Sequence, residues 1–493
     1  MDFKLPLLSL LIWLPILGGG LTLFFSNKNA TQAKWFALLI ALITLALGVP
    51  LYQRFDLVTP GMQILESHAW IPSFDIFYNL GADGISIALI LLTTFTTVLV
   101  LIGAWNSIDK RVPQYFAAFL ILEGLMVGVF CAMDAILFYV FFEGMLIPMF
   151  IIIGVWGGAN RIYAAYKFFL YTLLGSVLML LAMLWMANEA GTTSIPALKE
   201  YAFGPQAQSI LWLAFFASFA VKMPMWPVHT WLPDAHVEAP TGGSVVLAAI
   251  MLKLGAYGFL RFSLPIAPDA AREYAWLVIA LSLVAVIYIG LVALVQQDMK
   301  KLVAYSSIAH MGFVTLGFFV FNELGVAGGI VQMISHGFVS GAMFLCIGVL
   351  YDRVHSREIS SYGGVANTMP KFAAFALFFA MANCGLPGTA GFVGEWMVIL
   401  GAVQFNFWIG ALASSTLVLG AAYTLWMVKR VYFGEVANDE VRALKDISGR
   451  EFLMLALLAG AVLWMGLYPK PITDAMHLSV VGLLEHVAMP KMQ

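Results

Sequence analysis

Long apolar runs recur along this sequence and constrain its fold more than any other feature. About a dozen runs reach roughly 18 or more residues, which is the length a helix needs to cross the hydrocarbon core of a bilayer. Lipid offers the backbone no hydrogen-bond partners, so runs of this kind must be helical. With 62% hydrophobic and 11% charged residues, the sequence predicts an all-α polytopic membrane protein and excludes a soluble globular domain.

About fourteen transmembrane helices are expected from the positions of these runs. We place them at residues 5–25, 33–53, 84–105, 114–132, 134–156, 162–187, 208–232, 241–264, 273–296, 301–321, 324–351, 371–402, 405–430 and 452–469. The first run follows a lone Lys4 and has no small-residue cleavage site, which favours a retained span over a signal peptide.

Lysine and arginine predict the orientation, because cytoplasmic loops carry the excess of both. Of the 25 such residues, sixteen lie in or beside the loops after odd-numbered spans and seven lie on the opposite side. Both chain termini are therefore expected to face outward. The remaining two are Lys222 and Lys253, which lie inside apolar runs.

The first of these lysines stands beside an interrupted helix. Lys222 closes an apolar run, and Pro224 and Pro227 follow it at once. Proline gives no N–H and clashes with the carbonyl four residues before it, so the carbonyls of Ala220 and Met223 are expected to lose their helical partners. The second lysine, Lys253, lies about two turns or more from either end of its run, beyond the reach of a lysine side chain to the membrane surface.

A second interrupted helix is expected in the twelfth span, where the chain reads NCGLPGTAGFVGEW. Pro387 lies among glycines, frees the carbonyl of Asn383 and precedes Glu395 by about two turns. Paired interruptions five spans apart indicate two inverted five-helix repeats, each with a broken helix, around a site at mid-membrane. The expected division is N-terminal helices 1–3 at 1–106, a first repeat at 107–265, a second repeat at 266–433, and a cytoplasmic loop, helix 14 and tail at 434–493.

Charged side chains inside the expected spans are the candidate functional residues. Each costs about 2.5–3.5 kcal/mol at a helix centre, so a chain that keeps several of them is expected to use them. The candidates are Glu123, Glu143, Lys222, Lys253 and Glu395, with the linking histidines His310 and His336. A structural interpretation competes with this one, because a buried ion pair can lock two helices and a histidine can bond a carbonyl. For Glu123 and the histidines both interpretations stay open.

No feature of the sequence predicts a cofactor in this chain. Cys131, Cys346 and Cys384 lie apart inside apolar runs without CxxC spacing, which argues against a disulfide framework, an iron–sulfur cluster or a zinc site. There is no glycine-rich phosphate loop or dinucleotide fingerprint. A net charge of −2 gives no indication of nucleic-acid binding. Any redox chemistry is therefore expected in other chains.

Three strings carry a resemblance to a known family. They are FFEGMLIPMFIIIGVWGG, KMPMWPVHTWLPDAHVEAPTGGSVVLA and GLPGTAGFVGEW. They resemble the antiporter-like membrane-arm subunits of proton-pumping NADH:quinone oxidoreductase, respiratory complex I. Among the three subunits of this kind, the sequence is most similar to the chain M type, which carries glutamate at the position of Glu395 where the other two carry lysine. The tail from Pro471 to Gln493 is also too short for the long lateral helix of the chain L type.

The resemblance implies roles for the buried charges. Glu143 falls on the family's span-5 glutamate, Lys222 on its broken-helix lysine and Lys253 on its central lysine. A proton is then expected to pass from Lys222, beside Glu143, to Lys253, with water on the freed carbonyls, and onward along the residues that match the family's linking histidines and its terminal acid, namely His310, His336 and Glu395. The electrostatic change that drives this transfer would arrive from neighbouring subunits.

The same resemblance implies the setting. The partners would be the other membrane-arm subunits of complex I, including the two sister antiporter-like chains, in a bacterial cytoplasmic (inner) membrane. NADH, FMN, iron–sulfur clusters and quinone would belong to partner subunits. Two alternatives remain: a subunit of a multisubunit cation/proton antiporter, which resembles the same strings but is disfavoured by Glu395, and a structural scaffold whose buried charges would tolerate neutral replacement.

Overall fold

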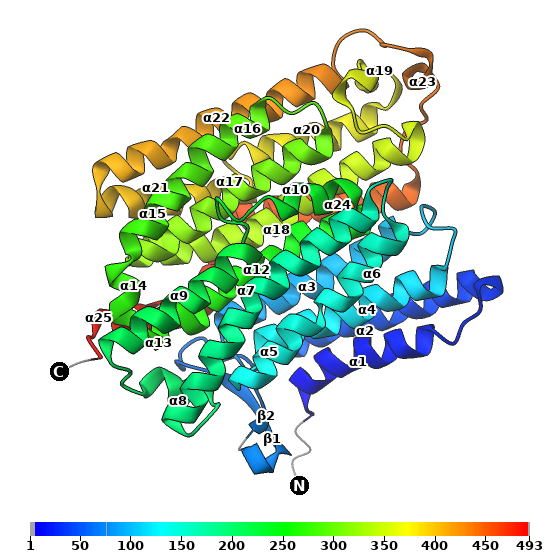
Figure 1. Cartoon of the computed structure of the whole chain (residues 1–493). Coiled ribbons are helices and arrows are strands. Elements are labelled where there is room, and N and C mark those ends of the chain that lie inside the picture. Colours follow the sequence, from blue (N-terminus) through cyan, green and yellow to red (C-terminus); the bar gives the residue numbers. More distant parts are fainter. Residues whose placement is uncertain (1–4, 75, 492–493) are drawn as a thin grey trace.

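The computed structural model describes residues 5–74 and 76–491 and is a bundle of long helices lying side by side (Figure 1). Within these residues, 11 helices are long and apolar enough to cross a membrane, and three shorter apolar helices accompany them. The predicted class, a polytopic helical membrane protein, is confirmed. Lys4, which entered the orientation argument, lies outside the described residues, as do the two last residues of the chain.

The N-terminal part consists of three long helices and a surface hairpin. Its elements are α1 (Leu7–Thr22), η1 (Asn27–Asn29), α2 (Ala30–Arg54), β1 (Gln63–Ile71), η2 (Pro72–Phe74), β2 (Ile76–Ala82) and α3 (Gly84–Gly103). The two strands pair antiparallel. The Glu66 carboxylate accepts the backbone N–H groups of Leu8 at 2.8 Å and Ser9 at 3.1 Å, so the hairpin caps the first helix. The sequence analysis did not foresee this hairpin.

The next region contains the first broken helix. Its elements are α4 (Val112–Cys131), α5 (Ala135–Gly144), α6 (Leu146–Trp156), α7 (Arg161–Ala190), α8 (Ile195–Glu200), α9 (Pro205–Lys222), α10 (Trp231–Glu238), α11 (Thr241–Val246), η3 (Leu247–Met251), α12 (Leu252–Gly258), η4 (Phe259–Ser263) and α13 (Leu264–Ile266). The helix that reaches Lys222 ends there, and the next one begins at Trp231 after eight residues outside a helix, a break predicted from the prolines. The segments η3 and η4 are π-helical turns, which the sequence did not indicate.

The first break shows where one freed carbonyl finds a new partner. The carbonyl of Ala220, expected to lose its helical partner to Pro224, accepts the backbone N–H of Met225 at 2.8 Å instead. The chain turns at the prolines, so an N–H five residues along reaches the carbonyl that the proline ring leaves open. The next carbonyl, of Val221, accepts the indole N–H of Trp231 at 2.8 Å. Protein groups thus satisfy both of these carbonyls at the break.

The following region contains the second broken helix. Its elements are α14 (Pro268–Glu273), α15 (Ala275–Val284), η5 (Ala285–Ile289), α16 (Gly290–Leu294), α17 (Met299–Phe319), α18 (Glu323–Val354), η6 (Ile359–Ser361), α19 (Val365–Thr368), α20 (Pro370–Asn383), α21 (Ala390–Phe405) and α22 (Phe407–Tyr432). The break falls between α20 and α21, at the predicted Pro387. The chain then continues through α23 (Asp439–Arg442), α24 (Gly449–Leu467) and α25 (Lys470–Ala488).

The two edges of the bundle differ in what they carry. The hairpin, α8 and α25 lie at one edge, while α19 and α23 lie at the opposite edge (Figure 1). The tail beyond α25 is tied to the first edge, because the Lys491 ammonium donates to the carbonyls of Tyr201 at 3.0 Å and Ile266 at 2.9 Å. The start of α1 and the end of α25 therefore share one side of the bundle.

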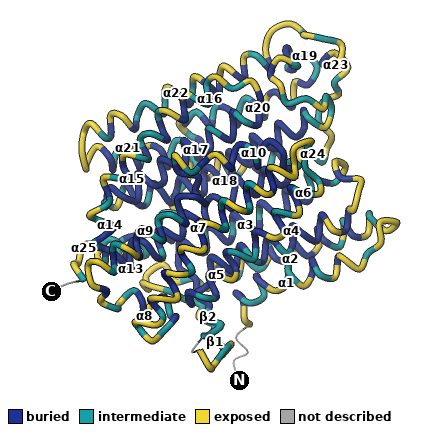
Figure 2. The backbone as a smooth tube through the Cα atoms, viewed as in Figure 1, coloured by how far each residue is buried: buried dark blue, intermediate teal, exposed yellow. Residues whose placement is uncertain are grey.

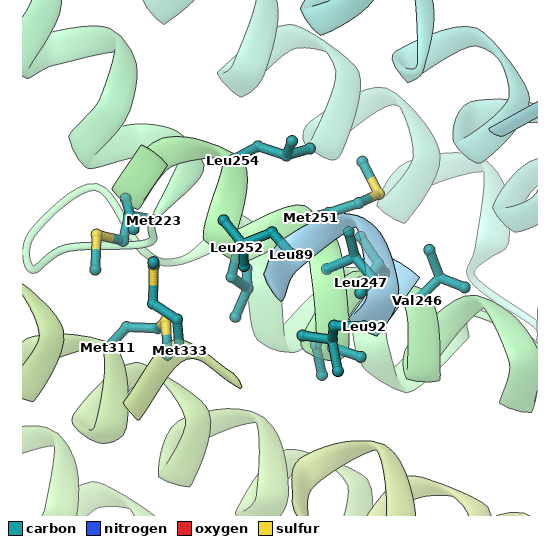
Figure 3. Close-up of a cluster of buried hydrophobic side chains, with 14 of the residues drawn as sticks. Leu89, Leu92, Met223, Val246, Leu247, Met251, Leu252, Leu254, Met311 and Met333 are labelled. Atoms are coloured by element: carbon teal, nitrogen blue, oxygen red, sulfur yellow. The ribbon is translucent and has the colours of Figure 1, made fainter. Parts of the chain in front are cut away.

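The core of the bundle surrounds α17, α18 and the segment from α11 to α13. These helices are buried along nearly their whole length, whereas α2, α7, α22 and α24 expose apolar faces, as lipid-facing helices do (Figure 2). Methionines and leucines fill the centre, where Met223, Leu252, Met311 and Met333 belong to one cluster (Figure 3). A lysine on any of the central helices is therefore far from solvent.

Candidate functional site

Lys253 lies at the centre of the bundle, two residues after the end of the π-helical turn η3 at Met251. Its side chain is wholly buried. The ammonium donates to the carbonyl of Ala248 at 2.5 Å and lies 2.7 Å from Nδ1 of His336. A π-helical turn shifts the helical hydrogen-bond register by one residue and is frequent at functional sites. The local fold therefore directs this lysine toward a histidine of α18 rather than toward either membrane surface.

The two histidines of the core face each other across α17 and α18. The rings of His310 and His336 have centroids 5.6 Å apart and planes inclined by 53°. In each ring, Nε2 is buried and has no hydrogen-bond partner among the described residues. Nδ1 of each ring has a partner of its own, the lysine for His336 and a carboxylate for His310. Each ring thus has one partnered nitrogen, Nδ1, and one nitrogen without a partner among the described residues, Nε2.

Glu395 is the carboxylate partner. Its Oε1 lies 2.9 Å from Nδ1 of His310, and its side chain is almost wholly buried. Glu395 can reach His310 because α21 packs closely on α18. A Cβ on Gly394 would lie 2.7 Å from the Cα of Gln332, so only glycine fits there. The glycine-rich sequence after the break therefore brings this acid into the core.

A small cavity lies where these groups meet. It is lined by His310, Gln332, Ser335, His336, Val339, Ala382, Asn383, Gly391 and Glu395. Its volume is about 10 Å³, which is about the space that one water molecule needs. The lining groups can give such a water hydrogen bonds, so the cavity offers room for one water between the histidine pair and the acid.

Glu143 and Lys222 are arranged differently. The Lys222 ammonium is buried without a hydrogen-bond partner and lies 4.8 Å from the ring centroid of Phe142. One carboxylate oxygen of Glu143, Oε1, is also buried without a partner. The ion pair expected between the two is therefore not formed in this structure, and the aromatic face takes the ammonium instead. Glu143 stands one residue from the end of α5, where the fifth span divides at Met145.

An apolar gap separates this pair from the central lysine. No hydrogen bond connects Lys222 with Lys253 in the described part of the chain. The residues next to them, Met223 and Leu252, lie in the same apolar cluster (Figure 3). The backbones come close, because a Cβ on Gly255 would lie 2.9 Å from the nitrogen of Met223. The gap is thus packed protein rather than a wet channel.

Glu123 lies apart from this line of residues. It is wholly buried on α4, and neither carboxylate oxygen has a hydrogen-bond partner in the described ranges. Its helix packs tightly on α1, since a Cβ on Gly124 would collide with the carbonyl of Ile12. The structure therefore places this residue away from the contacts that join the other candidates.

Several polar residues around the candidates Lys253, His336, His310 and Glu395 were not predicted from the sequence. Gln332 contacts both His310 and Glu395, each at 3.4 Å. Asn383 donates to the hydroxyls of Ser306 at 3.2 Å and Thr424 at 3.0 Å. Spacing could have found Gln332, because it precedes His336 by four residues and so lies on the same helix face. No local pattern marks Asn383, whose partners come from other helices.

Metal binding has no support in the geometry. No group of three or more histidine, cysteine, aspartate or glutamate side chains that could hold a metal ion occurs in residues 5–74 and 76–491. The site is a row of buried titratable side chains in the core of the helix bundle, from Lys253 through His336 and His310 to Glu395. Such a row, set beside two interrupted helices, defines a membrane protein of the antiporter-like class.

Comparison with known proteins gives the family. The model of the NADH:quinone oxidoreductase/Mrp antiporter transmembrane family matches residues 132–420. NADH-quinone oxidoreductase subunit M of Rhodobacter capsulatus is 52% identical over 498 residues, covering 97% of this chain and 96% of that one. NADH-ubiquinone oxidoreductase chain 4 of Arabidopsis thaliana is 49% identical over 481 residues, covering 97% of each. The chain therefore belongs to the family of subunit M and chain 4 proteins.

Solved structures agree with this assignment. A chain of respiratory complex I from Thermus thermophilus, determined with bound NADH, is similar with a TM-score of 0.90 and 31% identity, covering 97% of this chain and 99% of that one. A chain of the Mrp complex from Dietzia sp. DQ12-45-1b has a TM-score of 0.82 at 21% identity and is covered over 55% of its length. The second likeness shows the fold alone.

Proposed function

We propose that this chain is a proton-translocating membrane-arm subunit of respiratory complex I, the NADH:quinone oxidoreductase. The observation that supports the proposal is the arrangement of Lys253 against His336, of His336 beside His310 with ring centroids 5.6 Å apart, and of His310 against Glu395. Each of these groups can bind and release a proton, and each is buried at membrane depth, where an unused charge is costly. The names and lengths of the relatives support the same reading.

The connected residues transfer a proton by exchange at named atoms. The Lys253 ammonium gives a proton to Nδ1 of His336, and the ring releases its other proton from Nε2. Nε2 of His310 takes that proton across the cavity, directly or through one water. Nδ1 of His310 then gives its proton to Oε1 of Glu395. Each imidazole accepts at one nitrogen and donates from the other, which is the ordinary chemistry of a histidine relay.

The apolar gap controls the supply of protons to this relay. When Glu143 approaches Lys222, the opposite charges favour the protonated lysine, and when they separate, the lysine can release its proton. The released proton reaches Lys253 only when water enters between Met223 and Leu252. Movement of charge in neighbouring subunits would set the distance within the acid–lysine pair.

The proposal extends to the setting of the chain. We place it in the cytoplasmic (inner) membrane of a bacterium with both termini outward, in contact with the other membrane-arm subunits and the two sister antiporter-like chains. NADH, FMN, iron–sulfur clusters and quinone would be bound by partner subunits. Residues 107–265 and 266–433 are proposed as two inverted repeats, supported by a broken helix in each.

A multisubunit cation/proton antiporter is the weaker proposal. The length of the subunit M and chain 4 relatives agrees with this chain almost throughout, whereas the related Mrp chain is much longer. Glu395 also occupies the position at which the sister subunits resembling this one carry lysine. Copurification in mild detergent would separate the two, since only the first proposal expects redox subunits to accompany the chain.

Replacement of Lys253 by methionine tests the proposal. Methionine is unbranched and fills a similar space but cannot carry a proton. In Lys253→Met, proton translocation coupled to quinone reduction should fall by about tenfold or more. NADH oxidation with an artificial electron acceptor should persist, because it depends on other subunits. Near-normal translocation in an assembled Lys253→Met complex would refute the proposal, and Lys470→Met, an exposed lysine at the outer edge, is the control.

A further inference from the structure

Gln332 stands between the two groups at the end of the relay. Its amide nitrogen lies 3.4 Å from Oε1 of Glu395 and 3.4 Å from Nδ1 of His310. The side chain is buried on α18 and lines the small cavity. A side-chain amide in this position can donate to the carboxylate at the moment when the histidine gives or regains its proton. Neither the family assignment nor the relay itself gives this residue a role.

The orientation of the amide is fixed by a neighbour. The hydroxyl of Ser335 donates to Oε1 of Gln332 at 3.1 Å. With its oxygen engaged there, the amide presents its NH₂ group to Glu395. The reverse orientation would place the amide oxygen against a carboxylate oxygen, with no hydrogen between them. The Glu395 carboxylate, which only accepts, therefore selects the orientation in which Gln332 is a donor, and the Ser335 hydroxyl holds the amide in it.

We infer that Gln332 is a positioning residue that stabilises the ionised form of Glu395 and so lets the acid release its proton. This inference rests on the proposed function. In the ionised state the carboxylate accepts two donors, Nδ1–H of His310 and the amide of Gln332, and hydrogen bonds to a charged acceptor are the strong ones. Without the amide, the charged form of the acid would lose one of its two donors, and release of the proton from the end of the relay would be slower.

A purely structural role for Gln332 is the competing explanation. Its backbone packs directly on Gly394, so the residue certainly contributes to the contact between α18 and α21. Loss of packing would lower assembly at every pH. Loss of a donor to Glu395 would instead move the pH dependence of pumping, because the acid would stay protonated up to a higher pH.

The test compares pH profiles of proton translocation in inner-membrane vesicles that contain the assembled complex. Gln332→Met keeps the unbranched shape but removes the donor, and its acid limb should move to higher pH by about one unit. Ser335→Ala keeps the amide but frees its orientation, and its shift should be smaller and in the same direction. Ser307→Ala is the matched control, because that buried hydroxyl donates only to the carbonyl of Val303 at 3.0 Å.

Four outcomes would decide between these explanations. An unshifted profile in assembled Gln332→Met would overturn the inference, and so would reduced assembly without any shift. If Gln332→Met does not assemble, an unshifted Ser335→Ala profile would overturn it, because that variant keeps the helix contacts. Normal pumping by Glu395→Gln, measured in the same series, would instead defeat the proposed function itself.

Discussion

The two parts of the line of buried charges differ in how they are connected. From Lys253 to Glu395, polar contacts of 2.7 and 2.9 Å lead to the two histidines, whose ring centroids lie 5.6 Å apart. From Glu143 to Lys253, no direct polar contact is made within the described residues, and Lys222 lies against an aromatic ring. Under the proposed function, the first part controls the supply of protons and the second conducts them, because a proton crosses packed apolar side chains only when they move.

The difference has a cause in the packing. The second part lies between α17, α18 and α21, where polar side chains and a small cavity accompany the relay. The first part runs past a cluster of methionine and leucine between the first break and η3 (Figure 3). Methionine is flexible and adapts to changes in shape, so this gap can open without unfolding a helix.

The largest effect is expected from removing charge at Glu143. Glu143→Gln keeps the size but ends the attraction that holds the Lys222 proton, so pumping and coupled quinone reduction should fall by about tenfold. Glu143→Asp should keep part of both activities. Proton-to-electron ratios, measured beside complex assembly, check this. A wild-type proton-to-electron ratio in fully assembled Glu143→Gln would exclude the Glu143–Lys222 pair from the mechanism. The first part of the path would then have no group that controls proton supply.

A moderate effect is expected from a polar residue in the apolar gap. Leu252→Asn places an amide beside the path between the two lysines and should admit water. Quinone reduction should continue, while the proton-to-electron ratio should drop by roughly twofold because protons leak back. Leu92→Asn, in the same cluster but on α3, is the control and should show no leak. Equal ratios in Leu252→Asn and the wild type would mean that the gap is no barrier.

The smallest effect is expected at Glu123. Its carboxyl has no hydrogen-bond partner in the described structure and touches none of the other candidates, so Glu123→Gln removes no contact. Pumping should stay within about twofold of the wild type, which is within the ordinary range of a conservative change. A loss of pumping as large as that of Glu143→Gln would place Glu123 on the proton path. The two parts of that path would then no longer differ in the way described.

Much of the fold followed from the sequence, for physical reasons that can be named. Apolar length predicted the long helices, and Pro224 and Pro387 predicted the two breaks. The hairpin from Gln63 to Ala82 was missed because it lies outside the runs that are long enough to cross a bilayer. The π-helical turns were missed because they follow from packing between helices and leave no mark in residue type.

The site was harder to predict than the fold. Cost arguments selected five buried charges, and the structure brings two of them, Lys253 and Glu395, into contact with His336 and His310. The separation of Glu143 from Lys222 could not be predicted from the sequence, because the same two side chains can stand in contact or apart. The new partner of the Ala220 carbonyl could not be predicted either, since it depends on the turn that the prolines cause. Gln332 was overlooked because an amide carries no charge.

The central claim is that Glu395 ends a working proton relay rather than locking two helices together. The decisive measurement is proton translocation and complex assembly, made side by side in Glu395→Gln and Glu395→Lys. The account predicts that Glu395→Gln assembles but pumps at a small fraction of the wild-type rate, while Glu395→Lys, which can still exchange a proton, keeps part of the activity. Full assembly with normal pumping in Glu395→Gln, or failure of both variants to assemble, would contradict it.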